Sequence, residues 1–98
     1  MKYRKKPVVI EAFQMTKERR EDNSEWPEWL HSAWSKPSYS DGSLQPANPG
    51  SQTERRLYIM TLEGALVVQW NDWIIQGVQG ELYPCKPHIF EATYEAVP

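Results

Sequence analysis

The chain has 98 residues, a length that suits one domain and leaves no room for two. Hydrophobic residues make up 40% of it and charged residues 24%, which argues against a disordered chain, and no apolar run approaches the ~18 residues of a membrane-spanning helix. The net charge of −2 argues against general binding to nucleic acid.

Two further features bear on where the protein works. A basic N-terminal stretch precedes the apolar segment 8–15, but Glu11 and Gln14 interrupt that segment, so it does not predict a secretory signal. The single cysteine, Cys85, has no partner for an internal disulfide, which is typical of a reducing compartment. We therefore expect a protein of the cytosol.

The first half of the chain predicts one strand, one helix and a long loop. β-Branched and aromatic residues favour a strand over 7–15, and the charged segment 16–25 lacks apolar spacing and is interpreted as a connector. A short amphipathic helix is expected over 24–34, with Ser24 as its N-cap and an apolar face rich in indoles. Pro, Ser and Gly predict a loop over 35–56, and loops of that length are often functional.

The second half predicts a run of strands at 57–61, 65–70, 73–78 and 81–85. Short turns join them, so they are expected to pair antiparallel, and Pro87 is suited to open a final helical turn. The expected fold class is α+β: a mainly antiparallel sheet of four or five strands, one amphipathic helix and a long loop. We expect a single domain over 1–98, in which 16–56 is a variable helix and loop insertion and 57–98 is the β-rich core.

No catalytic or metal site is expected from the titratable residues. Cys85 and His88 are three apart, but zinc needs three or four ligands, and a Cys–His nucleophile pair needs an orienting acid that is not evident nearby. Asp72 is interpreted as an acid that organises its turn by accepting backbone N–H bonds, rather than as a catalytic carboxylate. We expect no cofactor and no enzymatic activity.

The tryptophans are the most informative feature, because five in 98 residues is more than a core of this size normally needs. One interpretation is that each of them simply fills the core. The other is contact with a partner, since aromatic residues dominate interface hot spots and stack on nucleobases. The second interpretation predicts a binding surface for a protein or ligand, with two arginines at the end of the loop, formed by Trp26, Trp29, Trp34, Arg55, Arg56 and Tyr58.

Three segments resemble a family of small phage and prophage proteins: RKKPVVIEAFQM at 4–15, TLEG at 61–64 and NDWIIQGVQGELYPCKPHIFEATYE at 71–95. Members of that family close with a pattern similar to G-D-[YW]-I-I-x-G-V-x-G-E-x-Y-P-C-K-P-x-I-F-x-x-T-Y-E. The match covers the first fifteen residues and roughly the last forty. The chain departs from the pattern at Asn71, where the family more often has glycine, and Asn is the next-best residue for a positive φ angle.

The resemblance implies a phage or prophage origin and residence in the host bacterial cytoplasm, and it supplies no mechanism. The leading hypothesis is a non-enzymatic phage accessory protein that binds and inhibits a host macromolecule, such as a component of antiviral defence. One alternative is a sponge that sequesters a nucleotide-like small molecule, as a homodimer with a shared groove. A minor virion component or an enzyme is a third class. The expected partner is thus a host protein or a nucleotide-like molecule, and no membrane.

Overall fold

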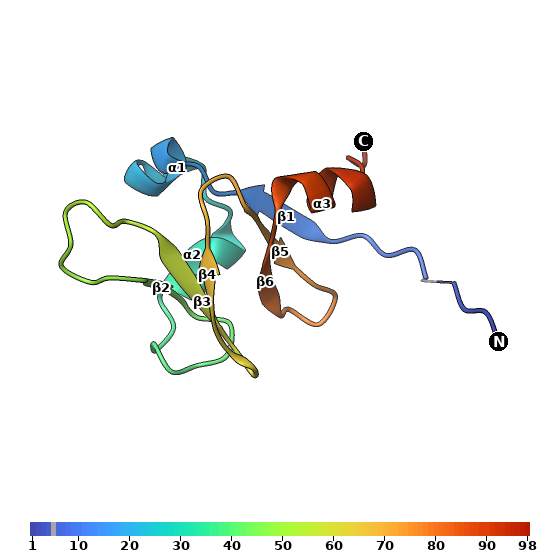
Figure 1. The fold of residues 1–98 in the computed structure, drawn as a ribbon, viewed down its shortest axis with the longest axis horizontal. Coiled ribbons are helices and arrows are strands. Elements are labelled where there is room, and N and C mark those ends of the chain that lie inside the picture. Colours follow the sequence, from blue (N-terminus) through green and yellow to red (C-terminus); the bar gives the residue numbers. More distant parts are fainter. Residues whose placement is uncertain (5) are drawn as a thin grey trace.

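A computed structural model describes residues 1–4 and 6–98 of the chain. It folds into short strands and short helices, as Figure 1 shows. In chain order the elements are β1 (Glu11–Gln14), α1 (Lys17–Glu21), the 3₁₀ turn η1 (Asn23–Glu25), α2 (Glu28–Trp34), β2 (Leu44–Pro46), β3 (Leu57–Thr61), β4 (Gly64–Val68), β5 (Trp73–Gln76), β6 (Leu82–Cys85) and α3 (Pro87–Thr93).

The strands form two antiparallel sheets of three strands each. Sheet A has the order β1-β5-β6 and sheet B the order β2-β3-β4. The expected α+β class is therefore confirmed, but the strands are divided between two sheets instead of forming one. The turn at Asn71 and Asp72 leads the chain from sheet B into sheet A, and Asn71 has a φ of 73°, which asparagine tolerates.

The main core lies between the two sheets and α2. Leu30 of α2 is fully buried there, and the inner residues of both sheets pack around it. These inner residues are Leu44, Leu57, Ile59 and Val68 from sheet B and Phe13, Ile74 and Leu82 from sheet A. Helix α3 packs beside Trp73 of sheet A, where the Phe90 ring stacks at 4.1 Å between centroids and 8° between planes.

The first elements differ from those expected. The strand predicted over 7–15 begins only at Glu11, because its partner β5 ends at Gln76, directly opposite. The segment interpreted as a connector contains α1, whose N-cap Thr16 accepts a hydrogen bond from the backbone of Arg19 at 3.1 Å. The helix predicted from Ser24 begins after Pro27 instead, and Ser24 belongs to η1.

The segment 35–56 is also less irregular than predicted, because it contains β2. Leu44 is fully buried and pairs with Ile59, which anchors the middle of the segment to sheet B. Backbone hydrogen bonds from Gly42 to Met60 (2.7 Å) and from Ala47 to Arg56 (2.9 Å) flank that pairing. The remaining strands and the helix that starts at Pro87 lie within two residues of their predicted bounds.

Residues 1–4 and 6–10 extend away from the body of the fold, at the end opposite α1 (Figure 1). They contribute to the elongated shape, which measures 50 × 27 × 22 Å along its principal axes. The helices of the described residues are short, with α2 and α3 at seven residues each, and none of them could span a membrane.

Candidate functional site: an arginine–tryptophan cluster

Helix α1 carries two arginines whose side chains turn back over the fold. The Arg19 guanidinium lies 4.6 Å from the centre of the Phe13 ring, and its Nη1 donates to the Gln14 carbonyl at 2.9 Å. The next residue, Arg20, donates from Nε to the carbonyl of Arg55 at 3.0 Å, and its guanidinium lies 5.3 Å from the centre of a Trp34 ring. Arg20 therefore joins α1 to the end of α2 and to the segment before β3.

Two indoles of the predicted surface meet at this point. Trp26 and Trp34 pack edge to face at 5.9 Å, and Trp26 Nε1 donates to the Arg19 carbonyl at 2.8 Å. Trp26 is 6% exposed and belongs to the core, whereas Trp34 is 36% exposed. We call Arg20, Trp26, Trp34 and Arg55 the arginine–tryptophan cluster, and Trp34 is the indole that it presents to solvent.

The cluster brings two positive charges together beside one carboxylate. Arg55 Nε lies 3.7 Å from Glu21 Oε1, an ion pair too long for a hydrogen bond, and this buried Nε finds no hydrogen-bond partner among the described residues. Burial lowers the pKa of Arg20, and the neighbouring charge of Arg55 lowers it further, against the opposing effect of Glu21. Arginine stays protonated in proteins, so both guanidinium groups are charged at neutral pH.

Arg56, one residue further on, is engaged elsewhere. Its guanidinium binds Glu54 with a shortest contact of 2.7 Å and donates to Gln69 Oε1, also at 2.7 Å. Hydrogen bonds from Arg56 lower the pKa of Glu54 to about 2, and the same bonds raise the pKa of Arg56. Donors that are already satisfied have less to offer a partner, so Arg55 is the stronger contact residue of the two.

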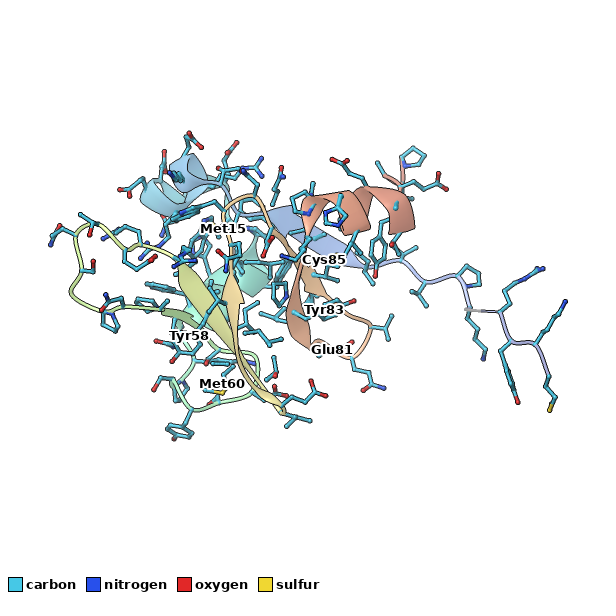
Figure 2. The ribbon with its side chains drawn as sticks, viewed as in Figure 1. Met15, Tyr58, Met60, Glu81, Tyr83 and Cys85 are labelled. Atoms are coloured by element: carbon cyan, nitrogen blue, oxygen red, sulfur yellow. The ribbon has the colours of Figure 1, made fainter. Side chains whose placement is uncertain are left out.

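The other two residues of the predicted surface lie apart from the cluster. Trp29 packs against the core and lines a hollow of about 220 Å³ together with Lys36 and Leu82, and its buried Nε1 has no hydrogen-bond partner within the described part of the chain. Tyr58 is half-buried on β3, opposite Val67 of β4. Figure 2 shows it along β3 with Met60.

Sequence reasoning missed Arg20, because the segment around it lacks apolar spacing. A signal was nevertheless present: Thr16 is a favoured N-cap residue, and the five residues that follow it are predominantly strong helix formers. That signal predicts α1 but not its contacts. The meeting of Arg20 with Arg55 joins positions 35 residues apart and depends on the tertiary fold.

The titratable residues outside the cluster are placed as follows. Asp72 is 5% exposed and accepts the Gln69 N–H at 2.9 Å, so the interpretation of this acid as the organiser of its turn is confirmed. Burial, and then the charge of Asp72, raise the pKa of the Cys85 thiol. Within residues 1–4 and 6–98 no three His, Cys, Asp or Glu side chains gather in a way that could hold a metal ion.

Comparisons with models of protein families, with curated proteins and with solved structures found no match. What the arginine–tryptophan cluster can bind is therefore inferred from its guanidinium groups and its indole. Paired guanidinium groups bind carboxylate and phosphate, and an exposed indole buries a large apolar area on contact. This combination suits contact with an anionic partner.

Proposed function

We propose that this chain is a non-enzymatic binding protein that docks on an acidic surface of a macromolecule through the arginine–tryptophan cluster. The observation that carries the proposal is the position of Arg20, held 5.3 Å from the half-exposed Trp34 ring and hydrogen-bonded to Arg55. Trp and Arg are the residue types most enriched among interface hot spots. Here they lie side by side at the surface.

The fixed position of Arg20 favours binding. Ordering a long side chain at an interface costs about 0.5–1.5 kcal/mol, and less is lost when the side chain is already held in place. The bond from Arg20 Nε to the Arg55 carbonyl at 3.0 Å and the contact with Trp34 provide that order before a partner arrives. Carboxylates of a partner would also relieve the repulsion between the two guanidinium groups.

The biological role that we propose follows from the resemblance to small phage and prophage proteins. The partner is a host macromolecule, binding inhibits it, and the encounter takes place in the host bacterial cytoplasm. An antiviral defence component is the class of partner that we expect. A nucleotide-like ligand is the second candidate, because an exposed indole beside guanidinium groups also suits a base joined to a phosphate.

The test begins with capture of a stoichiometric partner from bacterial lysate, followed by affinity measurements with the purified pair. We expect Trp34→Ala and Arg20→Ala each to weaken binding by ~30-fold, the effect of losing a 2 kcal/mol hot spot. The matched controls are Tyr39→Ala, at a tyrosine that is 83% exposed, and Lys17→Ala, an exposed cation of the same helix α1. Both controls should bind as the wild type does.

The outcomes separate the two candidates. Wild-type affinity in both cluster variants would refute the proposed surface. A thermal shift with bacterial nucleotides, with the ligand released intact on denaturation and no protein partner, would support the sponge instead. A chemically altered ligand would refute both candidate functions, since each of them predicts binding without a chemical reaction of the ligand.

A further inference from the structure

A small hollow opens where helix α2 meets the turn between β5 and β6. Its volume is about 220 Å³. One wall is a single face of α2, formed by Trp29, Ser32 and Ala33 at helical spacing. The chain continues this face just beyond the helix, because the N–H of Lys36 donates to the Ala33 carbonyl at 3.3 Å and the Lys36 side chain also lines the hollow.

The other wall comes from sheet A and from the segment after α2. Gln76 ends β5 and pairs with Leu82, the first residue of β6, so both side chains lie on the same face of the sheet. Gly80, in the turn between these strands, and Gly42 complete the wall. The hollow therefore receives apolar surface from two elements, as the Trp29 indole of α2 and as Leu82 of β6.

Three polar side chains of the hollow are available to a ligand. Lys36 forms no ion pair within the described part of the chain, and its Nζ has one long hydrogen bond, to the Asp41 carbonyl at 3.3 Å. The Ser32 hydroxyl and the Gln76 side-chain amide form no hydrogen bond with a described residue. Among the described residues that line the hollow none is acidic, so Lys36 gives it a positive charge.

Gly42 leaves the space that the Lys36 ammonium group uses. Its φ is 83°, in the region that favours glycine, and a Cβ atom at this position would lie 3.1 Å from Lys36 Nζ. The Gly42 N–H donates to the Met60 carbonyl of β3 at 2.7 Å, which fixes this glycine to sheet B. A side chain at position 42 would therefore push the positive charge away from its place beside the hollow.

The size and the charge of the hollow decide what it can hold. A cavity of about 150 Å³ holds one benzene ring, so this hollow suits one ring with a short substituent and leaves no space for the ribose and phosphate of a nucleotide. An adjoining hollow shares Lys36, Gly42 and Gly80 and is also lined by Asp41 and Glu81. Those two carboxylates disfavour further negative charge nearby, which favours a ligand with a single anionic group.

We infer that this hollow binds a small planar acid, a single aromatic or heteroaromatic ring that carries one carboxylate. The ring lies against the Trp29 indole and Leu82, and the carboxylate binds Lys36 Nζ, with the Gln76 amide as a second donor. The hollow shares no lining residue with the arginine–tryptophan cluster, so this inference is independent of the proposed function.

The test uses benzoate as the probe and the amide and indole N–H resonances of the isotope-labelled protein as the readout. Benzoate should shift the Trp29 Nε1–H and Gly80 amide resonances saturably, with a Kd on the order of a few millimolar for so small a ligand. Trp29→Phe assigns the indole resonance. Benzamide has nearly the same shape but no charge, and it should bind at least about fivefold more weakly.

Two pairs of variants locate the anionic group. Lys36→Gln should weaken benzoate binding about fivefold, whereas Lys17→Gln, at an exposed lysine of α1, should bind benzoate as the wild type does. Gly42→Ala should weaken binding as well, because the new Cβ displaces Lys36 Nζ. Gly50→Ala is its matched control, since Gly50 has a similar φ of 87° but no atom within 4 Å of an added Cβ.

Several results would overturn the inference. One is that benzoate shifts neither resonance at its highest soluble concentration, and another is that benzamide binds as tightly as benzoate. Wild-type affinity for benzoate in Lys36→Gln would also overturn it, and this exposed position keeps the fold even if Gly42→Ala does not. Tighter binding of a nucleoside monophosphate than of benzoate at the same resonances would refute the proposed ligand class.

Discussion

Asp72 illustrates how a buried acid can serve the fold. It is 5% exposed, its Oδ2 accepts the N–H of Gln69 at 2.9 Å, and its own N–H donates to the Gln69 carbonyl at 3.0 Å. Its carbonyl accepts the Met15 N–H and so ties the start of β5 to β1. A single residue therefore holds the turn that separates the two sheets.

Replacing this acid should destabilise the protein without any effect specific to binding. Asp72→Ala removes the acceptor of the Gln69 N–H, and a hydrogen bond to a charged group contributes about 1.5–3 kcal/mol. Urea unfolding measures the difference. Asp41→Ala, at an exposed aspartate, should change the free energy of unfolding by less than ~0.5 kcal/mol. Equal stability of the two variants would contradict the role assigned to Asp72.

Individual residues with strong local chemistry could be predicted from the sequence, and residues that act through tertiary contacts could not. Asn71 has the expected positive φ, and Pro87 begins α3, because backbone geometry at such residues is a local property. Arg20 has no comparable local signature for its partner. Whether an indole is buried is likewise decided by the fold, as the different exposures of Trp26 and Trp34 show.

At the scale of elements, α3 is the clearest case of a short helix held by side chains. Phe90 stacks on Trp73 of β5 and also contacts Tyr94 at 5.1 Å between ring centres. The hydroxyl groups of Tyr94 and Tyr83 lie 3.5 Å apart, which links the end of the helix region to β6. Figure 2 shows Tyr83 and Cys85 on that strand. Aromatic contacts thus fasten the C-terminal region to sheet A.

The contact between the Tyr83 and Tyr94 hydroxyl groups predicts a loss of stability at alkaline pH. Burial, and then the hydrogen bond with Tyr94, raise the pKa of Tyr83 from 10.0 to about 12. The unfolded chain ionises near pH 10 while the folded chain keeps its proton, so the stabilisation is complete below pH 10 and is lost between pH 10 and about 12. In urea unfolding, the stability difference between wild type and Tyr83→Phe should shrink over this range. A constant difference would contradict the burial of this hydroxyl.

Elements with a regular pattern were predicted well, and those fixed by long-range pairing were not. The strand at 57–61 has the predicted bounds, because its β-branched and aromatic residues match a half-buried strand. β2 was missed, since three residues ending in a proline carry no periodic signal and depend on pairing with β3. β1 was predicted too long, since the length of β5 limits it.

For the molecule as a whole, the decisive feature is that both sheets share one core. Ile59 of sheet B and Ile74 of sheet A are fully buried in the same cluster, together with Leu30 of α2. The composition predicts a single domain, but the division into two sheets depends on how that core is filled. Neither sheet can lose its inner residues without exposing those of the other.

Shared packing predicts one cooperative unfolding transition. Ile59→Ala and Ile74→Ala should each lower the free energy of unfolding by about 2–4 kcal/mol, as is typical when a buried aliphatic side chain is truncated. Tryptophan fluorescence and circular dichroism should report the same midpoint in each variant. Leu62→Ala, at a residue that is 90% exposed, serves as the control. Two separate transitions, with one sheet unfolding alone, would contradict the shared core.

β2 has one further consequence, for how this chain tolerates changes of length. By fastening residues 44–46 to β3, it divides the segment between α2 and β3 into two shorter spans. The second span, 47–56, has an exposed tip at 47–50 and ends at Arg55 and Arg56. Additional residues at such a tip are accommodated at little energetic cost. Evolution can therefore lengthen or reshape the chain next to the cluster while the core between the sheets stays the same.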